Sequence, residues 1–182
     1  MDALTALHTR TAAPRLTEPA PGPVELEQVL KAGLRAPDHG MLRLWRFLVV
    51  TGEARQKLGQ LFVDCLQPQS PEQSDKLLQS PQRAPMIIVA VATIKEHPKV
   101  PAIEQIASAV AAVQNMSVAI HALGFGSIWK TGAVAYDPKV KLALGLQTTD
   151  EIVGYLYVGT PTFKDRPVPE HKITDFVQDW QG

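Results

Sequence analysis

Three clusters in this chain hold the side chains best suited to chemistry. The first is Arg10-Thr11-Ala12 with Arg15, which follows a short helix expected over Asp2–Thr9 with Leu4 and Leu7 facing inward. A local basic cluster of this kind can bind a phosphate, because guanidinium groups pair well with phosphate oxygens. The same arginines could instead sit at the surface and cap the end of the preceding helix.

The second and third clusters combine basic, aromatic and glycine residues. Arg35-Ala36-Pro37-Asp38-His39 leads to Leu44-Trp45-Arg46-Phe47, and the third cluster runs from Gly124-Phe125-Gly126 to Ala133. The Gly-Phe-Gly triplet is only a fragment of a dinucleotide-binding motif, and it ends a helix instead of opening one. A helix C-cap followed by a turn into a strand is therefore its favoured interpretation. Taken singly, His39, His121, Phe125 and Trp129 could all be structural residues.

The sequence contains no complete motif for hydrolysis, phosphoryl transfer or metal binding. The P-loop pattern, the His-Glu-x-x-His and paired-cysteine metal patterns, and the Gly-x-Ser-x-Gly elbow are all absent. The single cysteine, Cys65, lies among leucines and reads as a small buried hydrophobe. We therefore assign no catalytic residue and no metal site. A bound cofactor that carries the chemistry would explain why the sequence contains no such motif.

Composition narrows the class of protein further. The 182 residues suggest one domain, and 18 basic residues balance 18 acidic ones. A chain of zero net charge has no general attraction for nucleic acid or anionic lipid. The longest apolar run, Met86–Ala92, is too short to span a membrane, and the N-terminus lacks a signal-peptide pattern. We expect a cytoplasmic protein that binds neither nucleic acid nor membrane.

Hydrophobic periodicity and proline positions predict an α+β layered fold. Strands are expected at 46–51, 86–93, within 124–130 and at 152–159, and the second of these should be covered on both faces. Helices are expected at 24–35, 53–66, 101–123 and 137–144. The polar segment 67–82 could be a lid or a connector, with a short helix possible at 72–79. Apolar residues in the C-terminal stretch, Phe163, Ile173, Phe176 and Trp180, should pack on the same subunit or on a partner.

These clusters, in this order and spacing, resemble the nitroreductase family, and most closely its short bacterial NAD(P)H nitroreductases. The likeness extends to Met1-Asp2-Ala3-Leu4, to Lys99-Val100-Pro101 before Glu104-Gln105, and to Ile152–Pro161. It implies a single domain over residues 1–182 with a central, mostly antiparallel sheet flanked by helices. It also implies an intertwined homodimer with FMN bound at the interface and NADH or NADPH as electron donor.

The resemblance also implies which residues bind the two cofactors. Those matching the family's FMN contacts are Arg10, Thr11, Ala12, Arg35, His39, Thr131, Gly132 and Ala133. Arg35 and His39 would approach the flavin from the facing subunit or bridge the two subunits. Those matching a segment assigned to the nicotinamide nucleotide are His121, Ala122, Leu123, Gly124, Phe125 and Gly126.

The implied activity is ping-pong hydride transfer from NAD(P)H, through FMN, to a nitroaromatic, quinone or similar small electron-poor acceptor. Two departures from the family pattern bear on it. Arg10-Thr11-Ala12 replaces the frequent Arg-Arg-Ser, and Arg43-Leu44 replaces the frequent Gln-Pro before the tryptophan. They motivate an alternative, an FMN-binding sensor or carrier with little turnover. A flavin-free structural dimer would require all three clusters to be coincidental.

Overall fold

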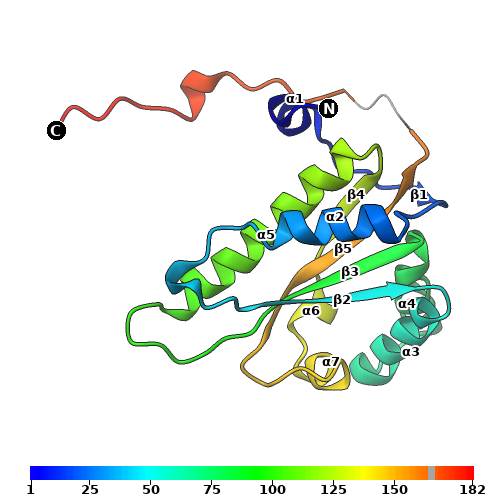
Figure 1. Ribbon diagram of the computed structural model, residues 1–182. Helices are drawn as coiled ribbons and strands as arrows, with labels where there is room; N and C mark the ends of the chain where they lie inside the picture. The colour runs from blue at the N-terminus through cyan, green and yellow to red at the C-terminus, as the bar shows by residue number, and fades with distance from the viewer. Residues whose placement is uncertain (164–166) are drawn as a thin grey trace.

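The fold is built on a five-stranded antiparallel sheet within residues 1–163 and 167–182, which this computed structural model describes. The strands are β1 (Leu16–Thr17), β2 (Trp45–Thr51), β3 (Met86–Ala92), β4 (Gly126–Lys130) and β5 (Glu151–Pro161). Their order is β1-β5-β3-β2, and β4 also pairs with β5 (Figure 1). The expected α+β class with an antiparallel sheet is confirmed.

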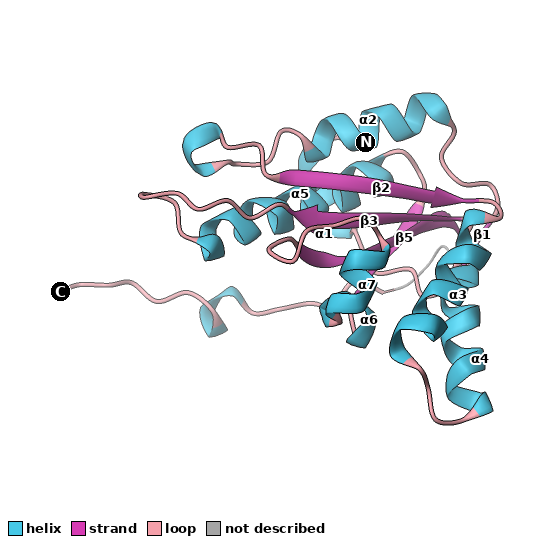
Figure 2. Ribbon diagram, turned by 90° about the horizontal axis from the view of Figure 1, so that it is seen from below, coloured by secondary structure: helices cyan, strands magenta, loops and turns pink. Residues whose placement is uncertain are grey.

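Helices cover both faces of the sheet (Figure 2). The helices are α1 (Ala3–Thr9), α2 (Pro23–Gly33), α3 (Ala54–Leu66), α4 (Pro71–Gln79), α5 (Ala102–Ala122), α6 (Ala133–Tyr136) and α7 (Pro138–Ala143), with single turns η1 (His39–Met41), η2 (Ser80–Arg83) and η3 (Ile173–Asp175). α2 and α5 lie on one face, and α3, α6 and α7 lie on the other. No helix in the described part of the chain is long and apolar enough to cross a bilayer.

β3 lies at the centre of this arrangement, and all seven of its residues are buried. Successive side chains of a strand point to opposite faces. Ile88 and Ala90 accordingly enter the core under α5, whereas Ile87 and Val89 enter the core under α3. The continuous apolar run therefore forms a strand covered on both faces, as its composition predicts.

The N-terminal helix shows where periodicity alone misled. α1 forms where expected, and the Asp2 carboxylate caps it by accepting from the Thr5 backbone N–H. The expectation that Leu4 and Leu7 point inward is wrong in this chain, because both are exposed and Ala6 is the buried residue. α1 lies across the end of α5 rather than along it, so its apolar stripe has no long partner to pack against. Strand β1 and helix α6 were not anticipated.

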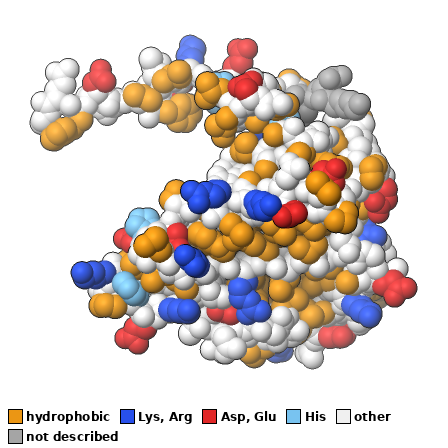
Figure 3. Space-filling view, viewed as in Figure 1, with side chains coloured by type: hydrophobic (Ala, Val, Ile, Leu, Met, Phe, Trp, Pro, Cys, Tyr) orange, Lys and Arg blue, Asp and Glu red, His pale blue; other side chains and the backbone are white. Residues whose placement is uncertain are grey.

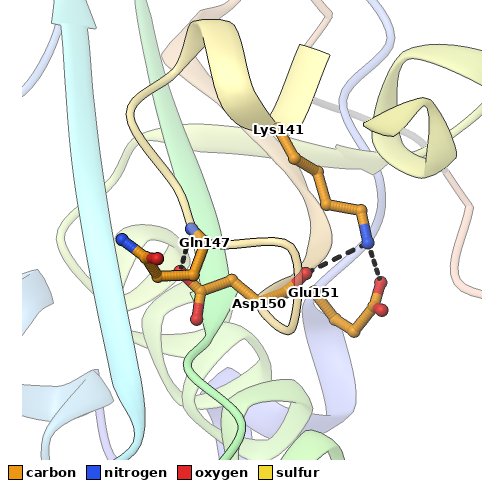
Figure 4. Close-up of polar contacts among 4 residues, drawn as sticks. All are labelled: Lys141, Gln147, Asp150 and Glu151. Atoms are coloured by element: carbon orange, nitrogen blue, oxygen red, sulfur yellow. Dashed lines mark hydrogen bonds and ion pairs between the residues drawn. The ribbon is translucent and has the colours of Figure 1, made fainter. Parts of the chain in front are cut away.

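A buried lysine joins α7 to the start of β5 (Figure 4). The Lys141 ammonium donates to the Asp150 carbonyl oxygen at 3.1 Å and to the Glu151 carboxylate at 2.9 Å. The Asp150 carboxylate in turn accepts from the Gln147 backbone N–H at 2.9 Å. These contacts close the loop that leads into β5 and set where that strand begins.

Replacing Lys141 by methionine should lower the free energy of unfolding by about 1–3 kcal/mol, the usual cost of stranding buried polar partners. The side-chain stem stays in place, so the loss reports on the ammonium group. Chemical denaturation measures the change, and Lys139→Met on the exposed side of the same helix is the matched control. Equal stability of the two variants would show that the buried contacts contribute nothing.

Candidate functional site

A cavity of about 770 Å³ opens where the first loop, the end of α5 and the ends of β4 and β5 meet. The residues that line it are Met1, Thr9, Thr11, Ala12, Ala13, Pro14, Arg15, His121, Gly124, Phe125, Gly126, Thr160, Pro161, Phe163 and Pro167. Its size suits a cofactor-sized ligand. It therefore joins two of the clusters recognised in the sequence.

Backbone pairing fixes the first loop over the sheet. The Ala13 N–H donates to the Ser127 carbonyl oxygen at 2.9 Å, and β1 pairs with the end of β5. The loop can approach this closely because Gly126 has no side chain. A Cβ at that position would lie 2.9 Å from the Ala13 Cβ and 3.0 Å from the Leu16 Cδ2. The loop bearing Arg10 to Arg15 is thus held by β4 and β5.

The Gly124-Phe125-Gly126 triplet ends α5 and turns the chain into β4. Gly124 has φ of 86°, and the Phe125 N–H donates back to the Ile120 carbonyl oxygen at 3.0 Å. This is the C-cap geometry expected from the sequence. The turn delivers His121, Gly124 and Phe125 to the cavity wall, opposite the first loop.

The contacts of His121 at the cavity wall indicate which of its ring nitrogens carries the proton. The Thr9 hydroxyl donates its single proton to the Thr5 carbonyl oxygen at 2.6 Å. The His121 Nε2 atom, 2.8 Å from the same hydroxyl oxygen, must therefore be the donor in that contact. Burial, together with the nearby Arg10 guanidinium, lowers the pKa of His121. The imidazole is therefore neutral at pH 7, with its proton on Nε2.

This lowered pKa predicts a loss of stability in acid. The unfolded chain binds the His121 proton at a higher pH than the folded chain, so stability falls as pH drops below about 6.5, the usual histidine pKa. Without ligand, the melting temperature should fall between about pH 8 and pH 5.5, and less so in His121→Gln, which retains a donor for Thr9. The exposed His8→Gln is the control. An unchanged pH dependence in the His121 variant would refute this assignment.

The described charged side chains at the cavity are basic. Arg10 lies beside His121, and the Arg15 guanidinium lies 5.4 Å from the centre of the Phe163 ring. Hydroxyl groups of Thr9, Thr11 and Thr160 add polar surface, and none of the described lining residues is acidic. Such a surface complements a phosphate group.

The remaining predicted residues lie outside this cavity. Arg35 and His39 are exposed beyond the C-terminal end of α2, whereas the first loop lies near its N-terminal end (Figure 1). Thr131 and Gly132 are exposed between β4 and α6, and Ala133, also exposed, is the first residue of α6. Ala122 and Leu123 are half-buried near the end of α5 and do not line the cavity. Within one chain, Thr11 and Ala12 thus meet His121, Gly124, Phe125 and Gly126, with Arg10 adjacent.

Arg43 and Cys65, which the sequence analysis discussed apart from the three clusters, also lie outside the cavity lining. Arg43 is exposed, and its backbone N–H donates to the Asp38 carboxylate at 2.7 Å. Cys65 is partly buried on α3, and burial, with Asp137 and Asp64 nearby, raises the pKa of its thiol. The thiol is therefore protonated at neutral pH, in accord with the structural role expected of it.

Sequence reasoning did not assign several residues that line the cavity. Thr9, Ala13, Pro14 and the Thr160-Pro161 pair contribute to its wall. Phe163 was expected only as an apolar anchor of the C-terminal stretch. The pairing of β1 with the end of β5 brings these residues together, and that short strand carries no recognisable pattern in the sequence.

Comparison with known proteins defines the class. The nitroreductase family model matches residues 16–160, so this chain belongs to the nitroreductase family. It is 44% identical over 166 residues, 90% of this chain and 91% of the relative, to Escherichia coli K12 YdjA, named as an inferred NAD(P)H nitroreductase.

Solved structures share the fold across the whole chain. A nitroreductase-like family protein from Bacillus cereus has a TM-score of 0.84 at 23% identity, covering 100% of this chain and 97% of its own. A nitroreductase-type protein from Desulfovibrio desulfuricans, solved in complex with FMN, has a TM-score of 0.76 at 20% identity, covering 100% and 98%. At these identities the likeness establishes the fold.

Proposed function

We propose that this protein is an FMN-dependent oxidoreductase that uses NADH or NADPH to reduce nitroaromatic, quinone or similar electron-poor acceptors. The observation that carries the proposal is the cavity at the first loop, with cationic and hydroxyl groups and no acidic residue among its described lining. The chain's family, its relative's NAD(P)H nitroreductase name and the FMN complex of a protein of the same fold support it.

The residues present fit FMN at its phosphate end. Arg10 and Arg15 supply positive charge, and Thr11 supplies a hydroxyl where the family frequently has a second arginine. At Gly124 the missing side chain leaves open space beside the turn, where a ligand can approach the backbone. Arg10, Thr11 and Ala12 would hold the phosphate, and Thr131, Gly132 and Ala133 would face the ring.

The chain's own part in catalysis is to position and shield the reactants. When bound, FMN supplies the redox chemistry: NAD(P)H gives up a hydride and leaves as NAD(P)⁺ before the acceptor takes two electrons, with protons from solvent. The protein holds the rings in contact, excludes water and places positive charge near the site. No side chain need act as acid, base or nucleophile, so we assign none.

The segment His121–Gly126 matches the family's nicotinamide nucleotide segment, yet four of its residues line the same cavity as Thr11 and Ala12. Residues assigned to FMN and residues assigned to the nicotinamide nucleotide therefore line one and the same cavity. In a ping-pong cycle, FMN stays bound while nucleotide and acceptor exchange, so we assign the cavity to the FMN phosphate end. The nucleotide then reaches the flavin ring from solvent. We expect the protein to work in the cytoplasm, where NADH and NADPH are present.

We further propose a homodimer in which the facing subunit contributes Arg35 and His39. Exposed apolar side chains gather on the α2 and α5 side of the molecule (Figure 3), including Val24, Leu34 and Ile103. The C-terminal stretch projects from the body with Phe176 74% and Trp180 89% exposed (Figure 1). Apolar surface of this extent is expected to be covered by a second chain. Light scattering should give twice the chain mass, and a monomeric mass for the FMN-loaded protein would contradict shared sites.

Steady-state kinetics test the activity. With FMN-loaded protein and a quinone acceptor, NADH or NADPH should be oxidised, and double-reciprocal plots at several acceptor concentrations should be parallel, as a ping-pong cycle requires. Failure with both nucleotides and with every quinone and nitroarene tried would end the proposal. Tight FMN binding without turnover would instead favour the sensor or carrier, the alternative motivated by Thr11-Ala12.

A further inference from the structure

We propose that the Trp129 indole is the surface on which the flavin ring of FMN stacks. The inference rests on the proposed function and concerns the ring end of the cofactor, away from the cavity at the first loop. It assigns a binding role to an aromatic side chain whose position in the sequence is equally compatible with the core.

The first observation is the place of Trp129 along β4. This strand begins at Gly126 on the cavity wall and leads, through Lys130, to Thr131-Gly132-Ala133. At about 3.3 Å per residue, the chain from Gly126 to Gly132 covers about 20 Å, a span comparable to an extended FMN molecule. A cofactor with its phosphate at the cavity and its ring near Gly132 would lie alongside β4, the strand that carries Trp129.

The second observation is that the indole is held in one orientation. Its Nε1–H donates to the Val153 carbonyl oxygen at 3.0 Å. The ring lies directly against Gly154, where a Cβ would be 2.0 Å from Nε1 and 2.5 Å from Cδ1. Gly154 also has φ of 153°, a conformation that other residues rarely adopt. The ring is thus fixed across β5 before any ligand arrives, which reduces the entropy lost on binding.

The third observation is exposure. The tyrosines of β5, Tyr155 and Tyr157, are buried, whereas Trp129 on the neighbouring strand is 37% exposed. Trp129 is therefore an anchored aromatic residue with part of its surface open. Planar aromatic ligands bind such surfaces by offset stacking, and a flavin is a planar aromatic system.

Flavin fluorescence provides a readout that does not depend on turnover, because a stacked indole quenches it by electron transfer. FMN bound to the wild-type protein should be strongly quenched relative to free FMN. In Trp129→Phe the emission of bound FMN should rise severalfold. The dissociation constant should rise about two- to tenfold, which corresponds to the 0.5–1.5 kcal/mol of an aromatic pair. Trp45→Phe and Trp180→Phe are the matched controls and should remain quenched.

A double variant, Trp45→Phe with Trp180→Phe, leaves Trp129 as the only tryptophan. Its indole emission should fall when FMN is added, and this holds even if Trp129→Phe fails to fold. Unchanged quenching in a folded Trp129→Phe, or recovery in the Trp45 or Trp180 variant instead, would overturn the inference. So would wild-type protein that binds FMN without quenching it, an outcome that leaves the proposed function intact. Wild-type protein that binds no FMN would overturn the proposed function itself.

Discussion

Replacing Arg10 by alanine is expected to weaken FMN binding by about tenfold to a hundredfold. A hydrogen bond to a charged group contributes about 1.5–3 kcal/mol, and Arg10 can make such bonds to the FMN phosphate. The effect should be large here because Thr11 and Ala12 stand where the family frequently has a second arginine and a serine. Equilibrium titration of the apoprotein with FMN, followed by flavin absorption, measures the change.

The matched control for Arg10 is Arg46→Ala, an exposed arginine on β2 that does not line the cavity. Its FMN affinity should equal that of the wild type. The affinity difference for Arg10→Ala should also shrink when riboflavin, which lacks the phosphate, replaces FMN. Equal losses for FMN and riboflavin would place Arg10 away from the phosphate and contradict the assignment.

Phe62→Ala is expected to produce the largest loss of stability, about 3–5 kcal/mol, the range for truncating a buried phenylalanine. Phe62 is 1% exposed, and its ring meets that of Tyr155 edge-on with 5.6 Å between centres. Burial raises the pKa of Tyr155, so its hydroxyl keeps its proton and donates to the Val134 carbonyl oxygen at 2.9 Å. The mutation should therefore also loosen the segment that follows Gly132.

Calorimetry should show a melting temperature lower by about 6–20 °C for Phe62→Ala, given 2–4 °C per kcal/mol for a chain of this size. Tyr136→Ala, which truncates an exposed aromatic residue of α6, should change it little. A small change for Phe62→Ala would mean that the core under α3 repacks around the cavity.

Elements with strong local patterns were predictable from the sequence. The apolar run of β3 and the long helix α5 formed where expected, because burial on both faces leaves an almost uniform composition. Prolines and glycines marked several element ends correctly, as Gly124 does at the end of α5. The depth of Leu4 and Leu7 was not predictable, since it depends on the angle at which α1 meets α5.

The candidate site was predictable only in part. The contact between Thr9 and His121 joins residues 112 positions apart, and it depends on how β4 and β5 support the first loop. No local pattern encodes that arrangement. Family resemblance supplied Thr11 and Ala12 together with His121 and the Gly124–Gly126 turn, which the fold brings to one cavity. Arg35 and His39 lie away from this cavity in a single chain, so their assignment depends on a second subunit.

The most direct test of the central claim is an absorption spectrum of the purified, FMN-supplemented protein, recorded without oxygen before and after addition of NADH or NADPH. We predict flavin bands that remain with the protein through gel filtration, bleach on addition of a nicotinamide nucleotide and return when a quinone is added. Flavin bands unchanged by both nucleotides would contradict an NAD(P)H oxidoreductase and leave a flavin-binding protein without this activity.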